Sequence, residues 1–384
     1  MKNLKIALVK QDVYQDLYVC PSSEKDAGAI LMSSQMRVGP VGLFSDCHCD
    51  FYIVKEEMAP ETRIYRYVIP HKTKMLRLLK TQTLNSIPGH SGYCPGSEHP
   101  NGDFSVDCRE INWGNYDIVI SINVSLPTEV IRPYKSTLFA YMIGEANMAV
   151  SKPRFGYDVS LNQMARGIVG KHCGEVDFPY TFLNGYSLQN IMKSVLKRDS
   201  KKEGVFMEIN STTERPVRHV PEHFKPLEDA GYKILLHHQS IKENLTRLYD
   251  SKYFIKYGGR CIRGNSVAEA VSAGSLAIMN SDEVIHKELI IEECDVKSMD
   301  DILRLLKELD ADEQKYQTLL LKQKQLVSDL FFEKPLMSLV NCLNEKREQE
   351  KVYTRAERLD DLIYLSLMAL KAKLKLVKRW ITHR

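Results

Sequence analysis

The sequence predicts an α/β protein built from two Rossmann-like, doubly wound domains and finished by C-terminal helices. A chain of 384 residues is long enough for two ordinary domains. Strand-like apolar runs alternate with helical patterns in both halves, which is typical of parallel sheets. Beyond about residue 299 only helical patterns remain. With 43% hydrophobic and 27% charged residues, the composition is that of a globular protein.

The first half opens on a short apolar run that predicts a buried strand, residues 4–9. Two helices are expected, one over Ala27–Val38 after a Ser/Asp-rich step and a basic one over Lys72–Leu84. Further strands are expected at 51–54, 63–69, 116–122, 138–143, 157–163 and 175–182. Residues 85–113 are rich in Gly, Pro, Ser and His and predict a long loop that closes over a ligand.

The second half alternates more regularly. Four strands are expected at 204–209, 232–238, 252–257 and 275–280, with helices at 221–230, 240–251 and 266–273 between them. Helices over 299–309, 314–330 and 336–351 and a long terminal one follow.

The segment 259–283, "GRCIRGNSVAEAVSAGSLAIMNSDE", places cationic side chains and a glycine turn where a helix begins. Backbone N–H groups at a helix start form an anion site, and arginine suits phosphate oxygens. The predicted phosphate-binding residues are Gly258, Gly259, Arg260, Arg263, Gly264, Asn265 and Ser266. Alternatively, Ser266 and Glu269 form only a capping box.

The stretch "RGNSVAEAVSAGSLAIMNSDE" resembles the donor-binding segment of GT-B glycosyltransferases, and exostosin-type and bacterial polysaccharide transferases are similar. The resemblance covers about 25 residues in motif and roughly residues 204–330 in layout. It implies two domains facing across a cleft, with Glu269 on the ribose of a nucleotide sugar. The glutamate pair of many retaining members is incomplete, because Cys261 stands at its first position. The donor is therefore left open among UDP-, GDP-, dTDP- and CMP-linked sugars, and no further cofactor is expected.

The resulting organisation is an acceptor domain over 1–185, a linker over 186–203 and a donor domain over 204–332, with the boundary near 185–203. A closing helix over 333–352 and a basic amphipathic helix over 353–384 complete it. Lys256, Tyr257 and His238 are further donor-site candidates, although Lys256 at a solvated edge and His238 in the core are the alternatives. Acceptor binding is expected at Asp12, Asp16 and Arg37.

Two carboxylates at strand ends are the catalytic candidates, Glu145 and Glu208. Glycosyl transfer passes through an oxocarbenium-like state, so it needs a base or nucleophile at the anomeric carbon. In an inverting enzyme Glu145 would take the acceptor proton; in a retaining one Glu208 or Glu145 would attack the sugar. Either carboxylate could instead be a structural hydrogen-bond partner.

No metal site is expected. The spacing of Cys47, Cys49, Cys94, His99 and Cys108 matches no zinc motif, and no Asp-x-Asp follows a strand. The nine cysteines show no disulfide pattern, and no signal or membrane-spanning segment is evident. The expected location is therefore cytoplasmic.

Positive charge is concentrated at the C-terminus. Residues 366–384 hold six Lys or Arg and no acidic residue, so the net +4 of the chain less these six leaves −2 elsewhere, which argues against a nucleic-acid partner. An apolar stripe with spacings of four and three runs along the same segment: Ile363, Leu367, Leu370, Leu374, Val377 and Ile381. The pattern predicts a helix on an anionic membrane surface, the inner face of the cell membrane; a coiled-coil seam is the alternative.

Together these features predict a glycosyltransferase that moves a sugar from a nucleotide-sugar donor to a glycan acceptor, expected to be lipid-linked, in cell-surface polysaccharide synthesis such as lipopolysaccharide, O-antigen or capsule. The alternatives are a sugar-nucleotide epimerase of the same shape and a non-catalytic binding scaffold.

Overall fold

The structure is a computed structural model of the whole chain. It describes residues 4–11, 17–19, 30–32, 43, 47–54, 77–80, 106–109, 111–122, 126, 128–142, 156–162, 174–178, 182–208, 219–237, 241–259, 261–262 and 264–349. In the C-terminal segment it describes residues 355–357, 359–360, 362–364, 366–367, 370–371 and 374.

The chain forms two compact units. The first comprises residues 1–19, 46–180 and 335–384, and the second comprises residues 20–45 and 181–334. Residues 181–203, expected as the end of one domain and a linker, group with the second unit. The chain from residue 335 onward, expected as separate helices, groups with the first.

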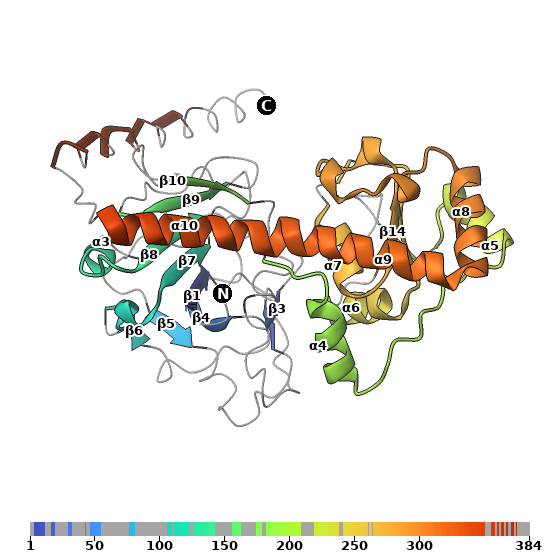
Figure 1. Cartoon of the computed structure of the whole chain (residues 1–384), viewed down its shortest axis with the longest axis horizontal. Coiled ribbons are helices and arrows are strands. Elements are labelled where there is room, and N and C mark those ends of the chain that lie inside the picture. Colours follow the sequence, from blue (N-terminus) through green and yellow to red (C-terminus); the bar gives the residue numbers. More distant parts are fainter. Residues whose placement is uncertain are drawn as a thin grey trace. The chain divides into compact units, whose positions relative to one another are not determined.

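The first unit is built on one eight-stranded sheet in the order β10-β9-β8-β7-β1-β4-β5-β6 (Figure 1). Its strands are β1 (Lys5–Gln11), β4 (His48–Val54), β5 (Arg77–Lys80), β6 (Val106–Asp107), β7 (Ile118–Ile122), β8 (Leu138–Met142), β9 (Val159–Asn162) and β10 (Gly174–Asp177). From β10 to β4 every neighbouring pair is parallel, and β5 and β6 add an antiparallel edge. The α/β class and the parallel sheet predicted from the sequence are confirmed.

Two helices predicted in this half are wrong where the structure describes them. Within Ala27–Val38, residues Ile30–Met32 form a short strand, β3. Within Lys72–Leu84, residues Arg77–Lys80 form β5, which pairs antiparallel with Tyr52–Val54 of β4. Pairing with a strand distant in sequence overrides the local helix propensity there. The expected strand at 63–69 and most of the expected loop at 85–113 lie outside the described residues; β2 (Leu17–Val19) was not expected.

Continuous apolar strands make the core of this sheet. Residues Ile6–Val9 of β1 are fully buried, and every residue of β7 and β8 is buried, as expected of central parallel strands covered on both faces. Two hydrogen bonds of the Tyr157 hydroxyl lie in this core: it donates to Ser121 Oγ and accepts from the backbone N–H of Leu126, both at 2.8 Å. Buried polar groups are therefore paired at this point of the sheet.

Helix α10 (Lys334–Gln349) is tied to the amino edge of the same sheet by two consecutive cations. Lys346 Nζ lies 2.7 Å from Asp158 and Arg347 lies 2.7 Å from Asp117. Each aspartate also accepts a strand N–H, that of Phe139 for Asp158 and that of Lys5 for Asp117. The same two carboxylates thus fix both the strand starts and the helix.

The second unit holds a four-stranded, wholly parallel sheet in the order β12-β11-β13-β14. The strand bounds are β11 (Val205–Met207), β12 (Ile234–Leu235), β13 (Tyr253–Lys256) and β14 (Leu276–Met279). The helices are α4 (Ser187–Leu196), α5 (Lys225–Asp229), α6 (Ile241–Asp250), α7 (Asn265–Ser272), α8 (Met299–Ala311) and α9 (Glu313–Ser328). Every strand and helix predicted between residues 204 and 330 is present, and the order of strands reverses between β11 and β13, as in a doubly wound fold.

Alternate strand residues serve opposite faces of this sheet. Val205, Ile255 and Ile278 share one apolar cluster with residues of α5, α8 and α9. The edge of β14 is closed by Gln323 of α9, whose amide accepts from Ala277 N at 2.8 Å and donates to Ala277 O at 2.6 Å. A side chain thereby replaces a neighbouring strand and removes an unpaired sheet edge.

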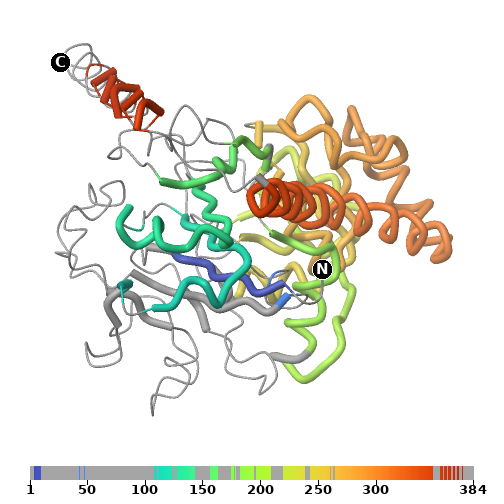
Figure 2. Tube along the Cα trace, turned by 60° about the vertical axis from the view of Figure 1, so that its left-hand side comes forward, coloured from blue at the N-terminus to red at the C-terminus, as the bar shows by residue number. Residues whose placement is uncertain are grey.

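Helix α9, a π turn at Asp329–Glu333 and helix α10 follow one another along the chain without a break (Figure 2). Pro335 lies in the first turn of α10 and has no N–H to donate. A π turn immediately before the proline shifts the hydrogen-bond pattern, so that the helix continues through a residue that would otherwise interrupt it.

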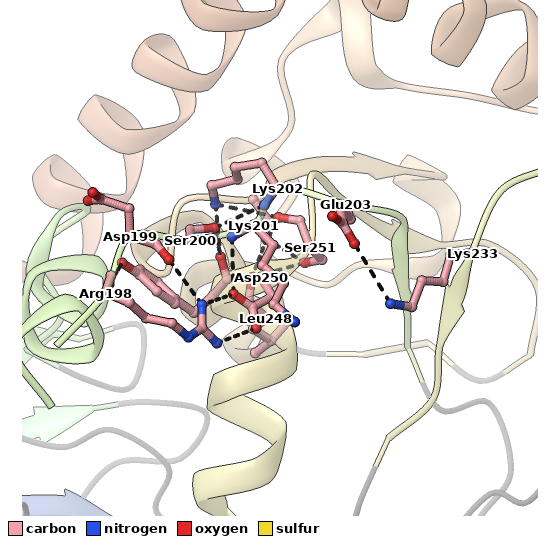
Figure 3. Close-up of polar contacts among 12 residues, drawn as sticks. Arg198, Asp199, Ser200, Lys201, Lys202, Glu203, Lys233, Leu248, Asp250 and Ser251 are labelled. Carbon is pink, nitrogen blue, oxygen red and sulfur yellow. Dashed lines mark hydrogen bonds and ion pairs between the residues drawn. The ribbon is translucent and has the colours of Figure 1, made fainter. Parts of the chain in front are cut away.

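The Ser/Lys-rich segment after α4 is held against the C-termini of α6 and α7. Arg198 makes a two-pronged ion pair with Asp250 at 2.7 Å for each pair of atoms (Figure 3). Lys202 Nζ donates to the carbonyl oxygens of Tyr249 (3.2 Å), Ser251 (3.4 Å) and Gly274. Cations at helix C-termini satisfy carbonyls that have no partner within the helix.

Candidate functional site

The candidate site lies at the carboxyl edge of the second sheet. Strands β11, β13 and β14 are parallel, so Glu208, Lys256 and Asn280, which end or follow them, lie at the same edge. The backbone joins them further, because Glu208 N donates to Ile255 O at 3.0 Å and Asn280 N donates to Lys256 O at 3.1 Å. Open α/β sheets bind ligands outside this edge, near the point where strand order reverses.

A buried ion pair holds the turn that follows β13. Lys256 is fully buried, and its Nζ lies 2.6 Å from Glu283 Oε2 and 2.5 Å from Gly258 O. The other oxygen of Glu283 accepts from Gly258 N at 2.9 Å and from the Asn280 amide at 3.4 Å. Lys256 therefore points into the protein and fixes the turn; neither the solvated-edge alternative nor direct contact with a ligand fits this geometry.

Sequence reasoning missed Glu283 as a member of this site. It lies in a short helical turn, Ser281–Glu283, that Asn280 caps by accepting from Asp282 N at 3.0 Å. The sequence did hold one indication of such a partner, namely Lys256 at the end of an apolar strand, because a buried ammonium group requires an anionic partner.

Two glycines of the turn adopt conformations that other residues avoid. Gly258 and Gly259 both have φ of 78°, and a Cβ on Gly258 would lie 3.4 Å from the ring of His223. His223 lies in a short helical turn, Glu222–Phe224. It brings an imidazole to the carboxyl edge of the sheet, beside the glycine turn, which the sequence did not predict. Burial and the positive charge of Lys256 lower the pKa of His223, which favours its neutral form.

The start of α7 has no side-chain cap among the described residues. Its N-cap is Gly264, with φ of 114°, and a Cβ there would lie 2.8 Å from Leu289 Cδ1. Since Gly264 is the cap, Ser266 is the second helical residue and Glu269 the fifth, so the alternative of a capping box between them is not realised. The first-turn N–H groups of a helix without a cap are available to an anion.

The described part of α7 after its first residue is buried, which fixes the helix in the unit. Ser266 is 9% exposed and Glu269 is 5% exposed, whereas Asn265 is half-buried. At the end of β11, Glu208 is 6% exposed, and its backbone N–H donates to Ile255 O at 3.0 Å. The carboxylates of Glu208 and Glu269 are therefore both buried in the second unit. Glu208 also lies at the carboxyl edge of the sheet, directly after β11.

Of the remaining predicted site residues, only Tyr257 belongs to the part of the chain that the structure describes. Tyr257 is half-buried directly before the glycine turn. The others lie outside the described residues, and their predicted roles stay predictions: Asp12, Asp16, Arg37, Glu145, His238, Arg260 and Arg263. No group of three or more possible metal ligands occurs among the residues that the structure describes.

No family model matches the chain, and no curated protein sequence matches it. The solved structures similar to it include phage T4 BGT with its UDP-glucose substrate (10% identity, 90% of this chain and 99% of that one, TM-score 0.35). An α-glucosyltransferase in complex with UDP and a 13-mer DNA matches at 10% identity, 89% and 100% coverage and a TM-score of 0.41. Sucrose-phosphate synthase from Thermosynechococcus elongatus matches at 13% identity, 90% and 99% coverage and a TM-score of 0.35. All three scores lie below 0.5, so the fold assignment rests on the two sheets of this chain.

Proposed function

We propose that the protein is a GT-B glycosyltransferase that uses a nucleotide sugar as donor. The observation that carries this proposal is the uncapped start of α7, reached through a positive-φ glycine turn at the carboxyl edge of a parallel sheet. Such a helix start offers several N–H donors and the positive end of the helix dipole to a phosphate group. The segment 259–283 that supplies it is the one whose sequence resembles the donor-binding segment of GT-B enzymes.

Each donor-site residue then has a distinct part. The N–H groups of Asn265 and Ser266 would face the phosphate oxygens, and Arg260 and Arg263 would neutralise their charge. Glu269 would bind the ribose, and Lys256 with Glu283 would keep the glycine turn in place. Both UDP-type diphosphate donors and CMP-linked sugars present such phosphate oxygens, so the class of ligand is a nucleoside phosphate ester of a sugar.

Transfer requires a carboxylate near the anomeric carbon while the phosphate leaves. Glu145 as base fits an inverting reaction, and Glu208 or Glu145 as nucleophile fits a retaining one. Glu208 is 6% exposed and follows β11 at the carboxyl edge of the sheet, where open α/β sheets place their ligands. The proposal assigns no metal ion to the site.

The acceptor we propose is a lipid-linked glycan of a cell-surface polysaccharide, such as lipopolysaccharide, O-antigen or capsule. It is supported by the basic amphipathic C-terminal segment, which would bring the enzyme to the cytoplasmic face of the membrane where such acceptors are anchored. Asp12, Asp16 and Arg37 are the proposed acceptor residues. No helix among the described residues is long and apolar enough to span a bilayer.

Thermal unfolding with UDP, GDP, dTDP and CMP tests the donor site. Ligand at 100 times its Kd stabilises the folded form by about 2.7 kcal/mol, so one of the four is expected to raise the unfolding temperature clearly. Replacing Arg260 and Arg263 by Gln is expected to weaken that nucleotide at least a hundredfold, since each charge-assisted hydrogen bond contributes about 1.5–3 kcal/mol. Arg304→Gln, an exposed arginine on α8, is the matched control. If none of the nucleotides stabilises the protein, the proposal fails.

Product analysis separates the activities that share such a site. With a stabilising nucleotide sugar and a lipid-linked glycan, transfer gives an elongated glycan, epimerisation gives a new nucleotide sugar, and a scaffold gives neither. Glu145→Gln should abolish transfer and leave nucleotide binding intact, because the carboxylate is assigned to chemistry and not to the phosphates. Full turnover of a folded Glu145→Gln variant would remove Glu145 from the mechanism.

A further inference from the structure

An apolar stripe is exposed along the C-terminal helix. The residues described between 355 and 374 are helical (Figure 1). Six of them are large aliphatic residues that are between 47% and 60% exposed: Leu359, Leu362, Ile363, Leu367, Leu370 and Leu374. At 100° per residue they fall within an arc of about 140°, so they form one continuous face. An apolar face of this length on a helix normally packs against protein.

The less exposed side of this helix is polar. Among its described residues, only Glu357, Asp360 and Tyr364 are half-buried, and all the others are exposed. This is the reverse of an ordinary surface helix, which turns its leucines inward and its charges outward. The described part of this chain therefore does not supply the cover for the leucine face.

Charge divides the helix into two halves. Residues 355–361 contain three acidic residues and two arginines, whereas residues 366–384 contain six basic residues and no acidic one. In the sequence of the second half, the spacing of apolar residues by three and four continues at Val377 and Ile381, and Trp380 directly precedes Ile381. An aromatic indole near the end of a cationic amphipathic helix is typical of a helix that lies at a lipid interface.

We infer that residues 366–384 dock in the plane of an anionic lipid surface through the leucine stripe, while residues 355–361 stay off it. Anionic headgroups complement the six cations, and repulsion from the three acids limits contact at the helix start. A second copy of the helix fits less well, because pairing of two such halves would bring cation against cation without acidic partners. This inference does not depend on the proposed enzymatic activity.

Intrinsic fluorescence of the full-length protein provides a direct test, because the chain has only two tryptophans. Trp113 is fully buried and donates to Cys108 O at 2.8 Å, so its emission should not respond to lipid. Adding vesicles of mixed phosphatidylglycerol and phosphatidylcholine should shift the emission of Trp380 to the blue, and bromine-labelled lipids should quench it. Trp380→Phe should lose the response and still sediment with the vesicles.

Sedimentation with the same vesicles measures the contribution of the stripe. Leu367→Glu combined with Leu370→Glu should lower the partition coefficient at least about a hundredfold, since burial of each leucine contributes more than tenfold. Leu321→Glu is the matched control, because Leu321 on α9 is 57% exposed and lies outside the stripe. Lys371→Gln should lower partitioning about fivefold, and pure phosphatidylcholine should bind weakly.

Two results would overturn the inference. One is failure of the unaltered protein to sediment with anionic vesicles. The other is a dimer in solution that the Leu367→Glu and Leu370→Glu variant converts to a monomer with no change in vesicle binding, which would assign the stripe to a second copy of the chain.

Discussion

Replacing Lys256 by Met should destabilise the second unit by about 3 kcal/mol, because it leaves a largely buried carboxylate without its cation. Removing one partner of a buried ion pair costs about 3–5 kcal/mol. Lys256 has a fully buried side chain and that of Glu283 is 17% exposed, which places the expected loss at the lower end of that range. The carboxylate would keep its bond from Gly258 N and lose the one from Nζ.

Lys322→Met is the matched control for this experiment. The Lys322–Glu293 pair has nearly the same separation, 2.7 Å against 2.6 Å, but its side chains are 51% and 42% exposed. Exposed pairs contribute about 0–1 kcal/mol, because water and salt already screen them. Any difference between the two variants therefore reports burial and not ion-pair distance.

Scanning calorimetry of both variants gives the readout. A change of 1 kcal/mol shifts the unfolding temperature by about 2–4 °C in a domain of 150–250 residues, so Lys256→Met should lower it by about 6–12 °C. Adding Glu283→Gln to Lys256→Met should recover part of the loss, because the remaining amide is uncharged and still accepts from Gly258 N. Equal shifts for Lys256→Met and Lys322→Met would refute the interpretation of the pair as a buried anchor.

Two further predictions concern the second unit. Burial, with a smaller contribution from the charge of Lys324, lowers the pKa of Lys202 from 10.5 to about 7. Between these two pH values the unfolded chain binds more protons at Lys202 than the folded protein does, so the free energy of unfolding rises with pH. Denaturation at pH 7 and pH 9.5 should show the unaltered protein gaining stability relative to Lys202→Met as pH rises; parallel pH profiles would contradict this. Gly264→Ala should destabilise by about 2–3 kcal/mol, since φ of 114° strains alanine and its Cβ would approach Leu289 at 2.8 Å. Gly231→Ala, with φ of 89° and nothing within 4 Å of the new Cβ, should lose only about 1 kcal/mol, and equal losses would exclude the close contact as the cause.

The part of the second unit between residues 204 and 330 was predictable because its signals are local. In β13 and β14 every residue is buried, and Gly231 and Gly274, both with positive φ, punctuate the helix ends as the sequence suggested. A strand covered on both faces appears as an unbroken apolar run, and a glycine with positive φ marks where a helix stops. These features depend on neighbouring residues alone.

The wrong helix at Lys72–Leu84, in the first unit, has the opposite origin. Arg77–Lys80 is a strand because Leu78 and Leu79 pair with Val54 and Ile53 of β4, which lie more than twenty residues away in the sequence. Its pattern, two leucines between two basic residues, suits a helix as well as a strand, so periodicity cannot decide between the two. Antiparallel pairing at the edge of the sheet, which decides it, is a property of the assembled unit.

The candidate site combines both kinds of information. The glycine turn and the helix start were evident from the motif, whereas the partner of Lys256 was not, because Glu283 lies 27 residues further along the chain. A strand-terminal lysine indicates that an anion is nearby, but not whether that anion is a ligand phosphate or a carboxylate of the protein. Packing answers this, since the Lys256 side chain is fully buried and points to Glu283.

The ion pair has a consequence for how the turn could bind a ligand. Glu283 accepts from both Lys256 Nζ and Gly258 N, so one carboxylate fixes the strand end and the backbone of the turn together. Positive φ angles at Gly258 and Gly259 are thereby maintained by protein contacts before any ligand arrives. A phosphate that meets donors already in position pays no reorganisation free energy on binding. The buried charges thus set the geometry of the turn as well as stabilising the unit, and loss of the pair should weaken nucleotide binding even under conditions where the variant stays folded.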